Sequence, residues 1–236
     1  MSLLALETAT RICGVAVLRS DEVLAQAHLY RPRVHSERLT PLVEDVLGHA
    51  GIEGHDLDAV AVSMGPGSYT GLRIGVSTAK GWALATGADL VGVPTLEAYA
   101  AQVRPIATSG DVVCALLDAR RDEVYAGAYR RTAEGLQRHA ETKALPVTAI
   151  PDWLGDVPGR LWLLGDGAPK SRDALTDVDA PKTLLPADEV PPSAAWVGRR
   201  GRHRLATDGP DDVDTFEPLY VKDVHATPAP SPFDGD

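Results

Sequence analysis

The chain has little cysteine and no long apolar run. Its two cysteines among 236 residues, Cys13 and Cys114, lie outside any Cys-x-x-Cys or Cys/His cluster. This pattern argues against a disulfide framework or a cysteine-based zinc site, and both thiols are expected to be buried in a reducing compartment. No stretch reaches the roughly 20 apolar residues that cross a bilayer, and no basic segment precedes the first apolar run. We therefore expect a cytoplasmic protein with no membrane partner.

Positive charge is also scarce. The chain has 23 Lys and Arg residues against 33 Asp and Glu residues, which gives a formal net charge of −10. A protein that holds RNA phosphates on its own surface needs basic side chains there. Nucleic acid is therefore not expected as the main direct partner, and contact with tRNA is expected only indirectly, through a complex that contains this chain. The hydrophobic content of 44% is that of an ordinary globular protein.

Two successive units are visible in the pattern of apolar runs and turns. Each opens with three short strands and continues with further helix and strand signals. The predicted strands are 3–6, 14–18, 23–30, 57–64 and 90–93, then 112–117, 123–130, 136–143 and 161–164. The predicted helices are 35–50, 72–85, 95–103 and 191–204. Helix 72–85 is rich in Ala, Ile, Val and Leu, which predicts that it is buried.

This repetition predicts an α/β fold with two duplicated mixed sheets flanked by helices. Such a fold is the two-domain actin-like (ASKHA, ribonuclease H-like) architecture of the actin, hexokinase and Hsp70 group. The first domain is predicted to cover 1–104. A second, reduced domain is predicted over 105–226, with a last helix that can pack back on the first domain. The Pro- and Asp-rich tail 227–236 is predicted to be disordered.

The most distinctive segment is a glycine-rich loop before helix 72–85. It reads Met-Gly-Pro-Gly-Ser-Tyr-Thr-Gly-Leu-Arg-Ile-Gly over 64–75. Glycine allows backbone angles that side chains resist, Ser68 and Thr70 can cap the helix, and free amides at a helix start attract anions. The spacing matches neither Gly-x-x-x-x-Gly-Lys-Ser/Thr nor Gly-x-Gly-x-x-Gly, so an anion or nucleotide loop and a structural turn are equal alternatives. The residues concerned are Gly65, Pro66, Gly67, Ser68, Tyr69 and Thr70.

The string over 64–75, followed by Ala79-Lys80-Gly81, closely resembles the signature of the TsaB (YeaZ) family. Four further segments resemble parts of the same family: 4–17, 35–41, 118–125 and 218–222. The resemblance covers nearly the whole chain and is densest before residue 130. It implies a paralogue of TsaD, the catalytic subunit of the transferase that forms N6-threonylcarbamoyladenosine at position 37 of ANN-decoding tRNAs.

The resemblance also implies a subunit without catalytic or metal-binding residues. The TsaD metal motif places two histidines four residues apart on a helix, where both reach one ion. In the matching stretch 92–99 of this chain, Thr95 and Tyr99 occupy those positions. The seven histidines are scattered without a His-x-x-x-His pair, and no Gly-x-Ser-x-Gly segment is present.

Pairing with TsaD through helices 36–47 and 72–85 is the expected activity of such a subunit. TsaE would join this pair as a third member, and a homodimer would form when TsaD is absent. No tightly bound cofactor is expected, and ATP or ADP would bind only in the assembled complex. The partner-binding candidates are His35, Glu37, Leu39, Leu42, Val43, Val46, Arg73, Ile74, Ser77 and Trp82.

Three alternatives remain. A stand-alone actin-fold ATPase or sugar kinase would need an Asp-x-Gly hairpin at its start, whereas this chain has Glu7-Thr8-Ala9. Glu7 is either a base or, as we favour, an anchor for the turn. An M22-like metallopeptidase would need a bound metal. An interaction module unrelated to tRNA would fail to bind TsaD.

Overall fold

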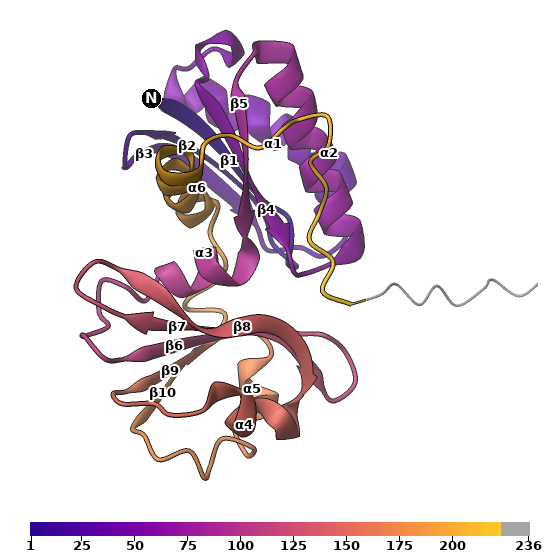
Figure 1. Cartoon of the computed structure of the whole chain (residues 1–236). Coiled ribbons are helices and arrows are strands. Elements are labelled where there is room, and N and C mark those ends of the chain that lie inside the picture. Colours follow the sequence, from indigo (N-terminus) through magenta and orange to yellow (C-terminus); the bar gives the residue numbers. More distant parts are fainter. Residues whose placement is uncertain (223–236) are drawn as a thin grey trace, which may run out of the picture.

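The computed structural model describes residues 1–222, so the predicted tail 227–236 lies outside the described part. Two five-stranded mixed sheets lie in separate halves of the structure, joined around a short helix (Figure 1). The first sheet contains β1 (Ser2–Glu7), β2 (Cys13–Arg19), β3 (Glu22–Leu29), β4 (Ala59–Gly65) and β5 (Asp89–Pro94). The second contains β6 (Val112–Asp118), β7 (Glu123–Arg131), β8 (Leu136–Pro146), β9 (Leu161–Leu164) and β10 (Lys182–Leu185).

The two sheets share one topology. Their strand orders are β3-β2-β1-β4-β5 and β10-β9-β6-β7-β8, so β6 to β10 repeat the positions of β1 to β5. In each sheet the first three strands are antiparallel, and the first, fourth and fifth are parallel. The predicted duplicated α/β fold is therefore confirmed. Strand β10 was not predicted, because four residues without strong alternation give little strand signal.

Helices cover both faces of the first sheet. Helices α1 (His35–Ala50) and α2 (Tyr69–Thr86) pack on the face that carries Leu4, Leu6 and Val15. Helix α6 (Ala194–Asp208) packs on the opposite face, which carries Leu3 and Ala5 (Figure 1). Side chains alternate along a strand, so burial of both faces explains why these strands are apolar at nearly every position.

Helix α6 follows the second sheet in the sequence but lies against the first sheet. Two glycines allow this close packing: a Cβ at Gly198 would lie 2.4 Å from the Leu18 side chain, and one at Gly201 would lie 2.6 Å from Ala61. The imidazole Nε2 of His28 accepts a hydrogen bond from the Ala194 amide at 3.2 Å, which fixes the start of the helix. The remaining helices are α3 (Thr95–Ala101), α4 (Ile150–Leu154) and α5 (Ala168–Ser171), with 3₁₀ turns at Gly54–Asp56 and Val147–Ala149.

The chain beyond α6 runs along the first unit and reaches the second. The Asp211 amide donates to the Leu90 carbonyl at 2.8 Å, and Phe216 enters the core beside α1 and α2. The Leu219 amide then donates to the Met64 carbonyl at 2.7 Å. Finally, Lys222 Nζ lies 2.5 Å from a Glu123 carboxylate oxygen in the second unit.

Within residues 1–222, no helix combines the length and apolarity required to pass through a membrane.

Candidate functional site

The glycine-rich loop joins β4 to α2 and ends at the helix cap. Ser68 is the N-cap of α2, and its hydroxyl accepts a hydrogen bond from the Gly71 amide at 3.3 Å. This confirms one of the two predicted caps. Thr70 lies inside the first turn of the helix and does not cap it. Gly87 ends the helix in a left-handed conformation, with φ of 75°.

The glycines of this loop are packed against the turn between β1 and β2. A Cβ at Gly67 would lie 2.2 Å from the Ala9 carbonyl oxygen, and one at Gly71 would lie 2.1 Å from the Thr8 carbonyl oxygen. The Ser68 amide donates to the Ala9 carbonyl at 2.7 Å. The bare Cα faces therefore let two backbone segments, far apart in sequence, meet and bond directly.

The amides of Gly65, Ser68 and Gly71 serve such internal contacts. The Gly65 amide donates to the Thr95 hydroxyl at 3.1 Å, while Gly65 itself has φ of 125° and lies against the Leu219 carbonyl. Carbonyl oxygens carry partial negative charge, so their presence beside Gly65, Gly67 and Gly71 disfavours an anion at the same place. The contacts favour the structural turn, and an anion or nucleotide loop over 65–70 remains a prediction.

Glu7 lies beneath the turn between β1 and β2. Its side chain is buried, and Oε1 accepts a hydrogen bond from the Ala9 amide at 2.9 Å. Burial raises the pKa of this carboxyl to about 7, against the lowering effect of hydrogen bonds from Ser63, Ala9 and Thr10. These contacts give Glu7 an anchoring role in the turn, which is the alternative favoured from the sequence.

Thr95 and Tyr99, which the resemblance implies stand in place of the TsaD histidines, both belong to α3 and are buried. The Thr95 hydroxyl accepts from the Gly65 amide, and the Tyr99 hydroxyl donates to the Val190 carbonyl at 2.7 Å. Each hydroxyl thus holds α3 against a distant segment. Across the described residues, no three His, Cys, Asp or Glu side chains are grouped as a metal ion would need.

Four of the predicted partner-binding residues point into the protein itself. Leu39, Val43 and Val46 are at most 1% exposed and belong to the core between α1 and the first sheet. His35 is also buried, with Nε2 3.1 Å from the Ile12 carbonyl oxygen. These four side chains are therefore unavailable to a partner in this conformation, because the apolar stripe of α1 covers its own sheet.

The other predicted residues lie at the surface. Glu37, Arg73 and Ser77 are exposed, whereas Leu42, Ile74 and Trp82 are half-buried. That a partner binds here remains a prediction.

The exposed face of α2 extends beyond the predicted residues Arg73 and Ser77. Leu84 is 64% exposed, and a Cβ at the exposed Gly81 would meet nothing within 4 Å. Leu84 lies seven residues beyond Ser77 and eleven beyond Arg73, so the three side chains share one helical face. The prediction of a buried helix is thus wrong for this face. The buried side of α2 consists of Gly71, Leu72, Gly75, Val76, Ala79 and Ala83.

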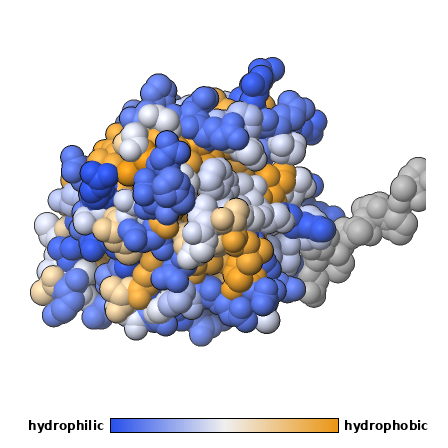
Figure 2. Space-filling view, turned by 90° about the horizontal axis from the view of Figure 1, so that it is seen from above, coloured by the Kyte–Doolittle hydropathy of each residue, from blue (hydrophilic) through white to orange (hydrophobic). Residues whose placement is uncertain are grey.

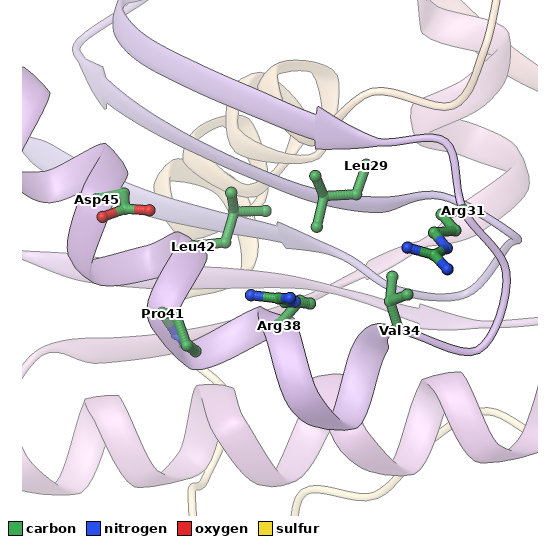
Figure 3. A pocket seen from close by; sticks show the side chains of 7 residues that line it. All are labelled: Leu29, Arg31, Val34, Arg38, Pro41, Leu42 and Asp45. Carbon is green, nitrogen blue, oxygen red and sulfur yellow. The ribbon is translucent and has the colours of Figure 1, made fainter.

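A shallow groove of about 320 Å³ lies between β3 and α1. Leu29 from the strand and Leu42 from the helix line its middle, while Arg31 and Asp45 lie at opposite ends (Figure 3). Seen from above, hydrophobic residues of the first unit form small patches separated by hydrophilic ones (Figure 2). This view therefore shows no single large apolar area.

The structure resembles solved proteins of the same architecture. A protein from Pseudomonas aeruginosa with similarity to peptidase YeaZ has a solved structure that matches with a TM-score of 0.80 and 27% identity. The match covers 94% of this chain and 99% of that one. YeaZ from Pseudomonas aeruginosa has TM-score 0.79 and 28% identity, over 93% and 99%. Component A of (R)-2-hydroxyglutaryl-CoA dehydratase from Acidaminococcus fermentans, at 10% identity and TM-score 0.52 over 88% and 100%, shares the fold alone.

The duplicated sheets and these neighbours define a protein of the actin-like, ASKHA class. The family model "TsaD: tRNA N6-adenosine threonylcarbamoyltransferase" matches residues 23–154. The protein TsaB of Escherichia coli K12, named for tRNA threonylcarbamoyladenosine biosynthesis, is 39% identical over 94% of this chain and 95% of its own. Its Bacillus subtilis 168 namesake is 38% identical over 94% of both. The chain belongs to the TsaB (YeaZ) family, which confirms the resemblance seen in its motifs.

Two glycines of α2 provide a matched test of the loop packing. We expect Gly71→Ala to lower the free energy of unfolding by about 1–3 kcal/mol or more, because the new methyl group meets a buried carbonyl. Gly81→Ala should raise the free energy of unfolding by roughly 0.5–1 kcal/mol, because alanine favours an exposed helical position more than glycine does. Urea unfolding of both variants measures the difference. Equal changes in the unfolding free energy of the two variants would show that the Thr8 carbonyl does not limit the space at Gly71.

Glu7 predicts a pH-dependent stability. The folded state keeps the Glu7 proton up to about pH 7, whereas the unfolded state releases it near 4.5. Stability from the protonated carboxyl is therefore present below pH 4.5 and lost as the pH rises toward 7, by up to about 3 kcal/mol. Glu7→Gln keeps an acceptor for the Ala9 amide without titrating. The unfolding free energy of the wild type minus that of Glu7→Gln should fall over this range, and a constant difference would contradict the assignment.

Proposed function

We propose that the chain is the non-catalytic subunit that binds and activates TsaD, and so takes part in forming N6-threonylcarbamoyladenosine at position 37 of ANN-decoding tRNAs. Family membership supports the pathway, because relatives at 38–39% identity are named for this biosynthesis. The observation that carries the non-catalytic role is the use of Thr95 and Tyr99. These two residues stand in place of the metal-binding histidines, and their hydroxyl groups form hydrogen bonds that hold α3 in place.

The binding face that we propose is the exposed side of α2 with the neighbouring surface of α1. Arg73, Ser77, Gly81 and Leu84 combine an arginine, small residues and an exposed leucine. Small residues let a second helix approach closely, and a leucine in water gains free energy when a partner covers it. The match of a TsaD model to this chain supports a partner of like fold, for which helices can pair with helices in near-twofold symmetry.

The same face accounts for a homodimer when TsaD is absent, since a near-symmetric surface can pair with its own copy. TsaE binds the TsaD pair as a third member in this proposal. Contact with tRNA is indirect and occurs through TsaD, in keeping with the net charge of −10. A nucleotide binds only in the assembled complex.

Reconstitution tests this function directly. Threonylcarbamoyl transfer is measured with TsaD, TsaE, the enzyme that makes threonylcarbamoyl-adenylate, ATP, threonine, bicarbonate and unmodified tRNA, with and without this chain. We expect modification to collapse without the chain, and the chain alone to hydrolyse neither ATP nor peptides. Equal modification without it would contradict the proposal. Turnover of ATP or peptide by the chain alone would instead favour the kinase-like or peptidase alternative.

The binding face has its own test. We expect Leu84→Glu to weaken binding to TsaD at least tenfold, because it places a charge in a face that must lose water. Ile106→Glu is the control, since Ile106 is similarly exposed, at 57% against 64%, but lies after α3 and away from α2. Calorimetric titration with TsaD measures both. Unchanged binding by Leu84→Glu would remove this face from the proposal.

A further inference from the structure

Exposed apolar side chains gather beside the glycine-rich loop. Among the described residues, the large hydrophobic side chains at 40% exposure or more are Met1, Tyr30, Tyr69, Leu84, Ile106, Leu219 and Tyr220. Three of these, Tyr69, Leu219 and Tyr220, meet at one place although about 150 residues separate them in sequence. Tyr69 begins α2, and the other two belong to the segment that follows α6.

An arginine completes this cluster. The rings of Tyr69 and Tyr220 are 5.1 Å apart between centroids and inclined by 36°. The Arg73 guanidinium carbon lies 5.6 Å from the Tyr69 centroid, and Arg73 Nη1 donates to the Tyr69 hydroxyl at 3.0 Å. We call Tyr69, Arg73 and Tyr220 the tyrosine platform. Tyrosine and arginine are the residue types enriched among the residues that dominate protein–protein binding energy.

The backbone beneath the platform is fixed before any partner arrives. The Leu219 amide bonds to the Met64 carbonyl at 2.7 Å, and the Leu219 carbonyl fits against the bare Cα of Gly65. Tyr69 is held in the first turn of α2, directly after the Ser68 cap. A surface ordered in this way loses little conformational entropy when it binds, which favours affinity.

The platform continues the exposed face of α2. Arg73 belongs to both, and Ser77 and Leu84 follow it along the helix. A partner that lies along α2 and passes its N-terminal end therefore meets Tyr69 and then Tyr220. The chain after α6 also lies next to α2 (Figure 1). The exposed Glu217 three residues before Tyr220 and the net charge of −10 disfavour a polyanion as the occupant.

We propose that TsaD covers the tyrosine platform in the heterodimer, with Tyr69 and Tyr220 as anchors and Arg73 as the residue that orients Tyr69. This inference rests on the proposed function and extends it, because it makes the segment after α6 part of the partner interface. The segment thereby has two roles: it ties the two units of this chain together, and it presents an aromatic side chain to TsaD.

Binding of purified TsaD to the full chain, measured by calorimetry, tests the platform. We expect Tyr220→Ala and Tyr69→Ala each to weaken binding by about 10- to 100-fold, as truncation of a dominant interface residue does. Tyr220→Phe should stay within about threefold of the wild type, because the ring is retained. Tyr30→Ala is the matched control: it is 66% exposed and pairs with His28, which bonds to α6 on the opposite side of the first sheet.

The outcomes separate this inference from the function on which it rests. If the wild type does not bind TsaD, the proposed function itself fails. If the wild type binds and both alanine variants bind within threefold of it, with unchanged thermal unfolding, the platform is not part of the interface. Loss of self-association with unchanged TsaD binding would assign the platform to a second copy of this chain. Loss of ATP or ADP binding by the intact pair would assign it to a nucleotide, and either result overturns the proposal.

Discussion

The meeting of the β1–β2 turn with the start of α2 is the contact on which the rest of the first unit depends. The Ser68 amide bonds to the Ala9 carbonyl, and the carbonyls of Thr8 and Ala9 fill the space that side chains would need at Gly71 and Gly67. This approach places α2 on the sheet and leaves its outer face to the solvent. The same crowding places the carbonyl oxygens of Thr8 and Ala9 against the glycine-rich loop, where their partial negative charge disfavours an anion.

The pair of hydroxyls on α3 extends this constraint to the junction of the two units. Thr95 bonds to the glycine-rich loop, and Tyr99 bonds to Val190 in the chain that leads to α6. One short helix therefore connects the loop, the second sheet and the returning chain. Both buried hydroxyls thus have backbone partners, which offsets the cost of removing them from water.

The sequence predicts local elements well and distant contacts poorly. Helix 35–50 was predicted with the bounds found for α1, because apolar residues recur at three- and four-residue spacing and Gly51 stops the helix in the left-handed region. The sequence also indicated that this loop needs glycines. It did not show that the carbonyls of Ala9 and Thr8 occupy the space next to Gly67 and Gly71. The inner face of α1 was mistaken for a partner surface, because periodicity shows that a stripe is buried without showing what buries it. The platform of Tyr69 and Tyr220 was missed for the same reason, since two segments far apart in sequence build it.

The return of α6 to the first sheet has a consequence for synthesis of the chain. Leu3, Ala5 and Leu18 form an apolar face that α6 covers, yet α6 lies about 190 residues later in the sequence. Domains generally fold in the order in which the ribosome makes them. Here the first unit to be made has no cover for one face of its sheet until Ala194–Asp208 has emerged, whereas β6 to β10 are already complete. The second unit can therefore close first, and the first unit is the one that a holding chaperone would protect during translation.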